Sequence, residues 1–435
     1  MRVRLDITDL LEFLCTAPVL HGVQNVSHHL IQQLPERSGA QLIGYHPIYG
    51  RPFSVDIADI GQDTLCNLAS FKSFFGLDGR HPVKSRSAIR NRHPNRPLRR
   101  GFEELKRVLR RGSRALRAPD KPLHLHRTVE QFEIAAGDVV IVPGLNVWYP
   151  EYNRDLGAHT RTKHARLAAV LHDFGPVTEA QYFPHSYRAA FRDWMESLLP
   201  HADLLIAYSQ HTQHELQTLC PALAKDRRRV VIPLAHEFLQ GGDSKLRREV
   251  ADLCAGRYAL YVGRIEPRKN ILALVRVWAR LARELGSQLP DLVLAGRMNF
   301  PGNEFSETLD SIGPAASKIR LLKDLTTAEL ARLYSNCRFT VYPSFYEGWG
   351  LPVGEAASFG KVTAASRAAS IPEVLGDLAV YFDPGDEDDM ATVLHRLVTD
   401  NAYLTGLETR LRKEFRPRRW SDFARQVIDT STAQW

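Results

Sequence analysis

Short hydrophobic runs alternate with amphipathic stretches along most of this chain of 435 residues. Apolar runs of strand length predict strands buried on both faces, and apolar positions three or four residues apart predict helices that cover them. In the first half, strands are expected at residues 3–7, 41–49, 138–144, 165–173, 202–209 and 228–234, and helices at residues 23–34, 187–199 and 211–219.

The same alternation starts again in the second half. Strands are expected at residues 258–264, 291–296, 318–324 and 339–344, and helices at residues 270–285, 327–337 and around Glu355. Gly241 and Gly242 mark a linker near residues 235–243. Strands that alternate with helices, twice over, predict an α/β protein with two Rossmann-like, doubly wound domains.

Positive charge is concentrated in one segment of the chain. Residues 80–127 hold sixteen Lys and Arg and three acidic residues, within a chain of net charge +8, so the remainder is net acidic. Such a basic insert is compatible with a solvated excursion, with a contact to an anionic membrane surface, or with nucleic-acid binding. No nucleic-acid recognition motif accompanies the charge, and we favour the membrane contact.

Composition argues against several protein classes. No apolar run approaches the roughly 20 residues that a membrane-spanning helix needs. Asp6, Asp9 and Glu12 stand where a signal peptide would be apolar. The five cysteines show no CxxC pair and no metal-ligand spacing, and their odd number argues against a disulfide framework. We therefore expect a reduced, cytoplasmic protein.

Two cations follow the strand predicted at residues 258–264. Gly263 permits a tight turn, and Arg264 and Lys269 stand just before the helix predicted at residues 270–285. Ligands of open α/β sheets bind beyond the carboxyl ends of the strands, and two cations before a helix N-terminus suit a pyrophosphate. The alternative is an ordinary solvated loop, but the position at a strand end favours the anion site.

The segment FYEGWGLPVGEAASFG, which follows the strand predicted at residues 339–344, combines two glutamates with several glycines. Glu347 in the loop and Glu355 about one turn into the next helix could hold hydroxyls at opposite ends of one ligand. The backbone N–H groups of Gly350 and Leu351 could hold a phosphate or a sugar hydroxyl. The alternative is a solvated Glu347 and a Glu355 that only offsets a helix dipole; the glycine density favours a site.

Signals in the first half are weaker. His172 lies at a strand end, where an imidazole can donate a hydrogen bond or hold a proton near neutral pH; a histidine packed into the wall of the fold is equally compatible. Gly22, in HGVQNV, marks either a simple turn or a ligand-facing loop. The chain has no GxGxxG fingerprint, no GKS or GKT phosphate loop and no HExxH motif.

Four segments in order resemble the retaining glycosyltransferases of family 4, which have the GT-B fold. They are VGRIEPRKN, LVLAG, TAELARLYSNCRFTVYPSFYEGWGLPVGEAASFG and IPEVLGDLAVYFDPGD, and the likeness covers nearly all of residues 258–386. HGVQNV, LHD and AYSQHTQHEL carry a weaker likeness in the first half. The resemblance implies two domains facing across a cleft: residues 1–235 bind the acceptor, residues 243–415 bind a nucleotide sugar, and residues 416–435 form a helix that crosses back.

The resemblance also implies a role for each candidate residue by its position in a motif. Arg264 and Lys269 would hold the donor diphosphate, beside the turn at Gly263. Glu355 would hold the nucleotide ribose, while Glu347 and His172 would face the donor sugar as the candidate catalytic residues. The remaining positions would contact phosphate or sugar: Gly350, Leu351 and Gly22.

The activity implied is transfer of a hexose, with mannose favoured, from a nucleotide-diphosphate sugar such as GDP-mannose. The acceptor implied is lipid-linked or polysaccharide, in bacterial surface glycan or lipopolysaccharide synthesis at the inner face of the cell membrane. Retention of configuration is implied, with no metal or other cofactor. The alternatives are a UDP- or dTDP-sugar donor, and a non-catalytic nucleotide-sugar-binding or scaffold protein on the same fold.

Overall fold

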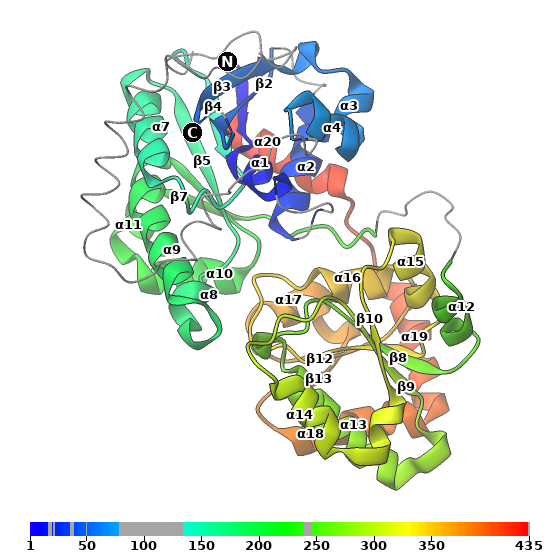
Figure 1. Cartoon of the computed structure of the whole chain (residues 1–435). Helices are drawn as coiled ribbons and strands as arrows, with labels where there is room; N and C mark the ends of the chain where they lie inside the picture. Colours follow the sequence, from blue (N-terminus) through cyan, green and yellow to red (C-terminus); the bar gives the residue numbers. More distant parts are fainter. Residues whose placement is uncertain are drawn as a thin grey trace.

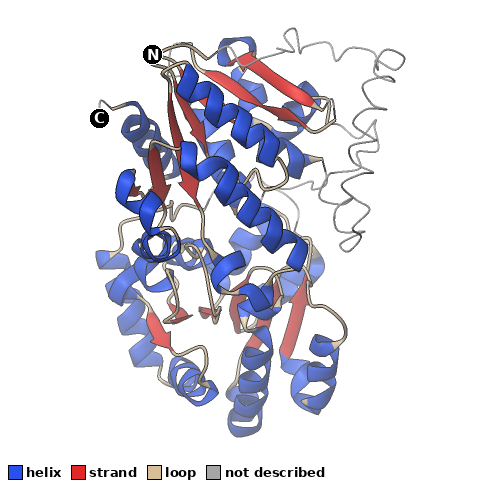
Figure 2. Ribbon diagram, turned by 90° about the vertical axis from the view of Figure 1, so that its left-hand side faces the viewer, coloured by secondary structure: helices blue, strands red, loops and turns tan. Residues whose placement is uncertain are grey.

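The computed structural model describes residues 1–77 and 134–433, except for residues 16–19, 21, 35–38, 49 and 239–245. The basic insert predicted at residues 80–127 and the linker glycines Gly241 and Gly242 lie outside the described residues. Two α/β units, each built on its own sheet, make up the described part of the chain (Figure 1 and Figure 2).

The first unit contains a seven-stranded sheet in the order β3-β2-β1-β4-β5-β6-β7. Neighbouring strands are parallel, except that β3 pairs antiparallel with β2. The strands are β1 (Val3–Asp6), β2 (Gln41–His46), β3 (Arg51–Asp56), β4 (Val139–Val142), β5 (Arg166–Leu171), β6 (Leu204–Ala207) and β7 (Arg228–Val231). The helices are α1 (Thr8–Leu14), α2 (Val23–Gln33), α3 (Gln62–Cys66), α4 (Leu68–Phe74), α7 (Pro150–Thr162), α8 (Gly175–Thr178), α9 (His185–Leu198), α10 (Gln210–Leu219) and α11 (Pro221–Asp226).

The second unit contains a six-stranded, all-parallel sheet in the order β10-β9-β8-β11-β12-β13. Its strands are β8 (Tyr258–Val262), β9 (Asp291–Ala295), β10 (Ile319–Leu322), β11 (Phe339–Tyr342), β12 (Thr363–Ser366) and β13 (Val380–Phe382). Its helices are α12 (Arg248–Cys254), α13 (Ile271–Leu285), α14 (Glu304–Ser311), α15 (Thr327–Asn336), α16 (Leu351–Ser358), α17 (Ile371–Leu375), α18 (Glu387–Thr399) and α19 (Asn401–Glu414).

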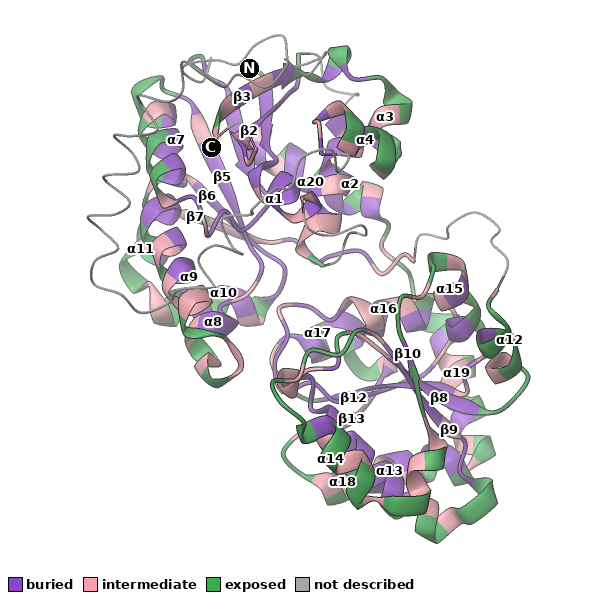
Figure 3. Cartoon of the chain, in the orientation of Figure 1, coloured by how far each residue is buried: buried purple, intermediate pink, exposed green. Residues whose placement is uncertain are grey.

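The central strands are apolar throughout because helices cover both faces of each sheet. Every residue of β4, β6 and β11 is buried, and Figure 3 shows β6 of the first sheet and β8 of the second coloured mostly as buried. Parallel sheets require this arrangement, because their crossover helices lie on both faces. The two doubly wound α/β domains predicted from the sequence are confirmed.

Chain order reverses at one place in each sheet, beside the first strand of the unit. The reversal falls between β1 and β4 in the first sheet and between β8 and β11 in the second. Open α/β sheets bind ligands outside the carboxyl ends of the strands at such a point. In the second sheet this point is flanked by the segments that follow β8 and β11, and these segments hold most of the candidate residues.

The last helix, α20 (Trp420–Thr432), packs on the first unit rather than on the second (Figure 1). The Trp420 ring stacks on His29 of α2, with ring centroids 4.3 Å apart. The two chain segments that cross between the units are joined to each other, because the His236 amide donates to the Arg418 carbonyl (3.0 Å) and the Arg418 amide donates to His236 Nδ1 (3.1 Å). Among the described helices, none combines the length and hydropathy of a membrane-spanning segment.

Candidate active site

The segment after β8 makes a tight turn that brings a cation to the surface. Gly263 has φ +148°, and a side chain on Gly296, after β9, would lie 1.8 Å from the Gly263 carbonyl oxygen. The two loops therefore pack backbone against backbone. Arg264 follows this turn and is exposed, and its guanidinium has no ion-pair or hydrogen-bond partner in the described part of the chain. A free cation at a strand end is available to an anionic ligand.

Lys269 lies in a buried charge network. Its Nζ is ion-paired with Glu347 Oε1 and donates a hydrogen bond to the hydroxyl of Tyr342 (3.1 Å). The second carboxylate oxygen of Glu347 lies 3.1 Å from Arg268, whose guanidinium also contacts Glu266 at 3.0 Å. The sequence predicted separate roles for Lys269 and Glu347, whereas the structure brings these two side chains into direct contact.

The network keeps Glu347 ionised although it is buried. Burial alone would raise the pKa of this carboxyl group, but the charges of Arg268 and Lys269 outweigh burial and lower the pKa to about 2. Burial lowers the pKa of Lys269, and the charge of Glu347 opposes that effect. A carboxylate that stays charged at neutral pH can accept hydrogen bonds from sugar hydroxyls, whereas it cannot serve as a general acid.

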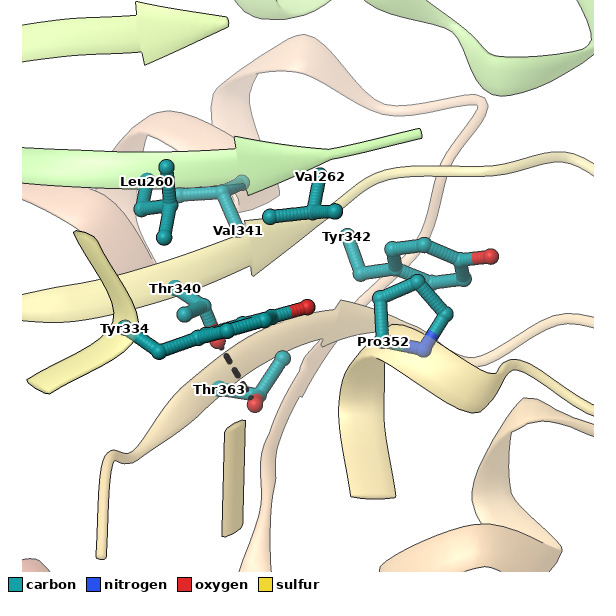
Figure 4. A pocket seen from close by; sticks show the side chains of 8 residues that line it. All are labelled: Leu260, Val262, Tyr334, Thr340, Val341, Tyr342, Pro352 and Thr363. Atoms are coloured by element: carbon teal, nitrogen blue, oxygen red, sulfur yellow. Dashed lines mark hydrogen bonds between the residues drawn. The ribbon is translucent and has the colours of Figure 1, made fainter. Parts of the chain in front are cut away.

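Glu355 is held in a different environment, on α16. It is half-buried, and its Oε2 accepts a hydrogen bond from the Tyr334 hydroxyl at 2.8 Å. Burial raises the pKa of Glu355 to about 7, because that single hydrogen bond offsets the effect only in part. Tyr334 also lines a small, mostly apolar space with Thr340, Thr363 and Pro352 (Figure 4). Tyr334, which orients Glu355 through its hydroxyl group, is thus packed among these side chains.

The N-terminus of α16 presents backbone donors beside these carboxylates. Gly350 is the N-cap residue with φ +109°, in the left-handed region that glycine favours. Pro352 has no N–H group, and the Val353 amide donates to the Gly350 carbonyl at 3.0 Å. The Leu351 amide has no hydrogen-bond partner in the part of the chain that the structure describes, so it is free to contact a ligand, as first-turn amides commonly are.

His172 belongs to the first unit and immediately follows β5. Its Nε2 lies 2.6 Å from the Pro143 carbonyl, which can only accept, so Nε2 carries the proton. Burial lowers the pKa of His172 to about 4, and the ring is therefore neutral at pH 7 with Nδ1 as an acceptor. This histidine is suited to receive a hydrogen bond from a ligand hydroxyl rather than to supply a proton.

The first and second units touch where His172 meets Gly348, the residue after Glu347. A Cβ on Gly348 would lie 2.2 Å from the His172 carbonyl oxygen, closer than side-chain carbons approach such an atom. Glycine is thus required for this approach. Through this approach the backbone of His172 lies against the backbone of Gly348, next to Glu347.

Gly22 stands apart from this group of residues. It is the N-cap residue of α2, with φ +46° and open space where a side chain would be. Its carbonyl accepts the Asn25 amide at 3.1 Å. Among the described residues, no contact joins Gly22 to the second unit, so its predicted place beside the phosphates stays a prediction.

Three polar residues of the first unit were not predicted as site residues from the sequence. They are Asp9, Asp173 and Tyr187. Burial raises the pKa of Asp173 to about 6 and that of Asp9 to about 7, and Gln24 donates to Asp9 at 3.0 Å. Burial raises the pKa of Tyr187, the charges of Asp173 and Asp9 raise it further, and the charge of Arg264 opposes them. Asp9 and Asp173 each follow a strand of the sheet, which is the signal that could have identified them.

The chain is similar in sequence to known glycosyltransferases. Residues 256–400 match the family model described as glycosyl transferases group 1. O-antigen chain mannosyltransferase B of Escherichia coli is 27% identical over 266 residues, which cover 61% of this chain and 69% of that protein. The serotype-specific mannosyltransferase WbdA of Escherichia coli is 30% identical over 232 residues, which are 53% of this chain but only 27% of WbdA.

A solved structure shares the fold over nearly the whole length of the chain. Sucrose-phosphate synthase of Thermosynechococcus elongatus has a TM-score of 0.60 at 16% identity, and the match covers 99% of this chain and 98% of that protein. A likeness at this identity shows the fold, which is of the GT-B type. The fold class predicted from the sequence is confirmed, and the predicted resemblance is confirmed as a likeness to group 1 glycosyltransferases with the GT-B fold.

Proposed function

We propose that this chain, a glycosyltransferase with a group 1 domain at residues 256–400 and the GT-B fold, transfers mannose from GDP-mannose to a growing bacterial surface polysaccharide. The observation that carries the choice of sugar and acceptor is the similarity over 266 residues to an O-antigen chain mannosyltransferase. The acceptor is a lipid-linked or free polysaccharide chain. The proposed localisation is cytoplasmic, at the inner face of the cell membrane.

The donor is held by the second unit. Arg264, with its free guanidinium, and Lys269 contact the diphosphate, and the Leu351 amide adds a backbone donor. Glu355 accepts hydrogen bonds from the ribose hydroxyls. Glu347 and the Nδ1 atom of His172 accept hydrogen bonds from hydroxyls of the sugar. These assignments are supported by the charges, exposure and hydrogen bonds of the residues.

The reaction proceeds with retention and without a metal. The bond from the sugar C1 to the diphosphate breaks, and its electron pair leaves with the phosphate oxygen. An acceptor hydroxyl oxygen forms the new bond to C1 on the same face, and its proton passes to the leaving phosphate. Arg264 and Lys269 stabilise the negative charge that develops on the diphosphate. Neither Glu347, held ionised, nor His172, held neutral, needs to exchange a proton.

A peripheral contact with anionic lipid is also part of the proposal. It rests on the charge of residues 80–127, which lie outside the described residues. Cationic residues near an anionic membrane contribute roughly 1 kcal/mol each. Sedimentation of the full chain with phosphatidylserine vesicles, and not with neutral vesicles, is the expected result.

The test of the proposed function has two steps. Thermal shift against GDP, UDP, ADP and dTDP first identifies the base, because a ligand that binds only the folded protein raises its apparent stability. The protein is then incubated with the matching nucleotide sugar, an isolated polysaccharide acceptor and EDTA. Release of the nucleoside diphosphate and an α-linked product from the α-linked donor are expected. Stabilisation by UDP or dTDP alone would contradict the GDP-mannose assignment, and no stabilisation and no release would favour the scaffold alternative.

Donor binding is expected to depend on pH through Glu355. The pKa of Glu355 is about 7 in the free protein, and only the ionised carboxylate accepts a hydrogen bond from each ribose hydroxyl through both oxygens. Affinity should therefore fall by roughly tenfold from pH 8 to pH 6. Titration calorimetry with the intact nucleotide sugar is the measurement, since both of its phosphates are esterified and do not titrate in this range. The Glu355→Gln variant should bind more weakly at pH 8 and show a flatter profile; an equally steep profile in this variant would assign the effect to other groups, such as Asp9 or Asp173.

A further inference from the structure

The loop that carries Glu347 is attached to the first unit on both sides of that residue. The Phe345 ring stacks on Tyr182, with centroids 5.9 Å apart and planes at 9°. Tyr346 reaches residues of the first unit through its hydroxyl group, and Gly348 lies against the His172 carbonyl. Glu347 alone in this stretch has its side chain in the charge network of the second unit.

The hydroxyl of Tyr346 makes two hydrogen bonds across the boundary. It donates to Glu215 Oε2 at 2.8 Å and accepts from the Phe174 amide at 3.0 Å. The tyrosine is buried, and Glu215 is also buried and is held by the Thr178 hydroxyl at 3.2 Å. Phe174 comes two residues after His172. The hydroxyl therefore ties the loop of Glu347 to the segment of His172.

The helix that carries Glu215 is itself fastened to the second unit. Both carboxylate oxygens of Glu373, on α17, accept backbone amides at the N-terminus of α10: that of Gln210 at 2.7 Å and that of His211 at 2.8 Å. A carboxylate at a helix N-terminus is favoured by the helix dipole. The partner of Tyr346 thus has a fixed place relative to the second unit.

The backbone of Tyr346 is fixed from the other side. Arg268 donates to the Tyr346 carbonyl and also contacts Glu347 Oε2 at 3.1 Å. The Phe345 amide in turn donates to the Arg268 carbonyl at 2.9 Å. One residue therefore has its side chain anchored in the first unit and its backbone anchored beside Glu347.

We propose that Tyr346 is a positioning residue that sets Glu347 of the second unit at a defined distance from His172 of the first, through its bonds to Glu215 and to the Phe174 amide. This inference rests on the proposed function, in which Glu347 of the second unit and His172 of the first both contact the donor sugar. Binding of the nucleotide moiety involves the second unit alone and does not depend on Tyr346. The residue acts on turnover and not on nucleotide affinity.

The Tyr346→Phe variant tests this role because it removes the hydroxyl and keeps the ring. We expect kcat to fall by roughly tenfold or more, since small displacements of reacting groups carry large costs in rate. The Kd of the nucleoside diphosphate should change by less than about twofold. A kcat within about twofold of the wild type, or a nucleotide affinity that falls in parallel with kcat, would overturn the proposal.

Two further sets of variants separate positioning from general stability. Tyr258→Phe removes another buried hydroxyl of the second unit, which donates to the Leu333 carbonyl at 2.8 Å, and should lower Tm without lowering kcat. Glu215→Gln keeps an acceptor for Tyr346 and should retain more activity than Glu215→Ala. The double variant with Tyr346→Phe and Glu215→Ala should be little worse than the worse single variant, because the two residues act through one hydrogen bond.

Hydrogen exchange gives a readout that needs no turnover. The Phe174 amide is protected by the Tyr346 hydroxyl, so the peptide that contains it should exchange faster in Tyr346→Phe than in the wild type and in Tyr258→Phe. Unchanged exchange would overturn the proposed link between the units. If the wild-type protein turns over no donor, the proposed function fails, and exchange alone still decides whether Tyr346 joins the two segments.

Discussion

Lys269→Ala is expected to lower kcat/KM by roughly a thousandfold, the largest loss among the single changes considered. Loss of a preorganised group that stabilises developing charge typically costs about a hundred- to a thousandfold. Lys269 has a second effect, because its Nζ is ion-paired with the buried carboxylate of Glu347. Without the ammonium group, Arg268 is the remaining cation on Glu347, and the pKa of Glu347 rises from its value of about 2. Steady-state kinetics of nucleotide release, with binding of the nucleoside diphosphate measured alongside, check this result.

Lys323→Ala is the matched control, since Lys323 is an exposed lysine of the same unit and its side chain should tolerate truncation. Combining Lys269→Ala with Glu347→Gln separates the two effects of Lys269. If the unpaired carboxylate is responsible for a loss of stability, the double variant melts at a higher temperature than Lys269→Ala, because the buried charge is gone. Activity is not restored in either case. Wild-type turnover in Lys269→Ala would exclude this residue from the diphosphate site.

Gly348→Ala is expected to lower kcat/KM by roughly a hundredfold while each unit stays folded. The added Cβ would lie 2.2 Å from the His172 carbonyl oxygen and 2.9 Å from the Asp173 Cβ. The two units must therefore separate by about 1 Å, and a misplacement of that size costs about a hundredfold in rate. Affinity for the nucleoside diphosphate should be nearly unchanged, because the donor residues lie on one side of the contact. Kinetics and small-angle scattering of the same samples are the measurements.

Gly406→Ala controls for the loss of a glycine. Gly406 lies within α19, and apart from its chain neighbours and the adjacent helix backbone no atom would lie within 4 Å of a Cβ at that position. This change should leave activity unaltered and should stabilise the second unit by up to about 1 kcal/mol, since glycine is a poor helix former. A Gly348→Ala protein as active as Gly406→Ala would show that the contact with His172 is absent during turnover.

The parts of the fold that were predictable are those in which local sequence and burial agree. β4 has the sequence Val-Val-Ile-Val and is buried at every position, so its apolar run was sufficient to predict a strand. β3 was missed because it is an antiparallel edge strand with Pro52 and exposed ends, and an edge strand needs no continuous apolar run. α7 was missed because Asn153, Gly157 and Thr160 share its buried face with apolar residues, which weakens the helical pattern.

Some residues of the candidate site could be predicted from their position along the chain alone. Arg264 and Lys269 follow a strand, and ligands bind at such ends. The partners of these residues were not predictable, because they depend on which loops meet in three dimensions. Tyr346 and Glu215 are separated by 131 positions and lie in different units, and nothing local in either segment indicates the other. The same applies to the contact of Gly348 with His172.

The placement of α20 has a consequence for the order in which the protein folds during synthesis. Trp420, Phe423 and Val427 are buried, and Trp420 stacks on His29 near the start of the chain. Domains usually fold as they leave the ribosome, with the N-terminal one first. Here the earlier of the two domains cannot bury the apolar face under α20 until residues 420–432 have been translated. Of the two domains, the N-terminal one is therefore made earlier and completed later, and a chain truncated before α20 should depend on chaperones to remain unaggregated.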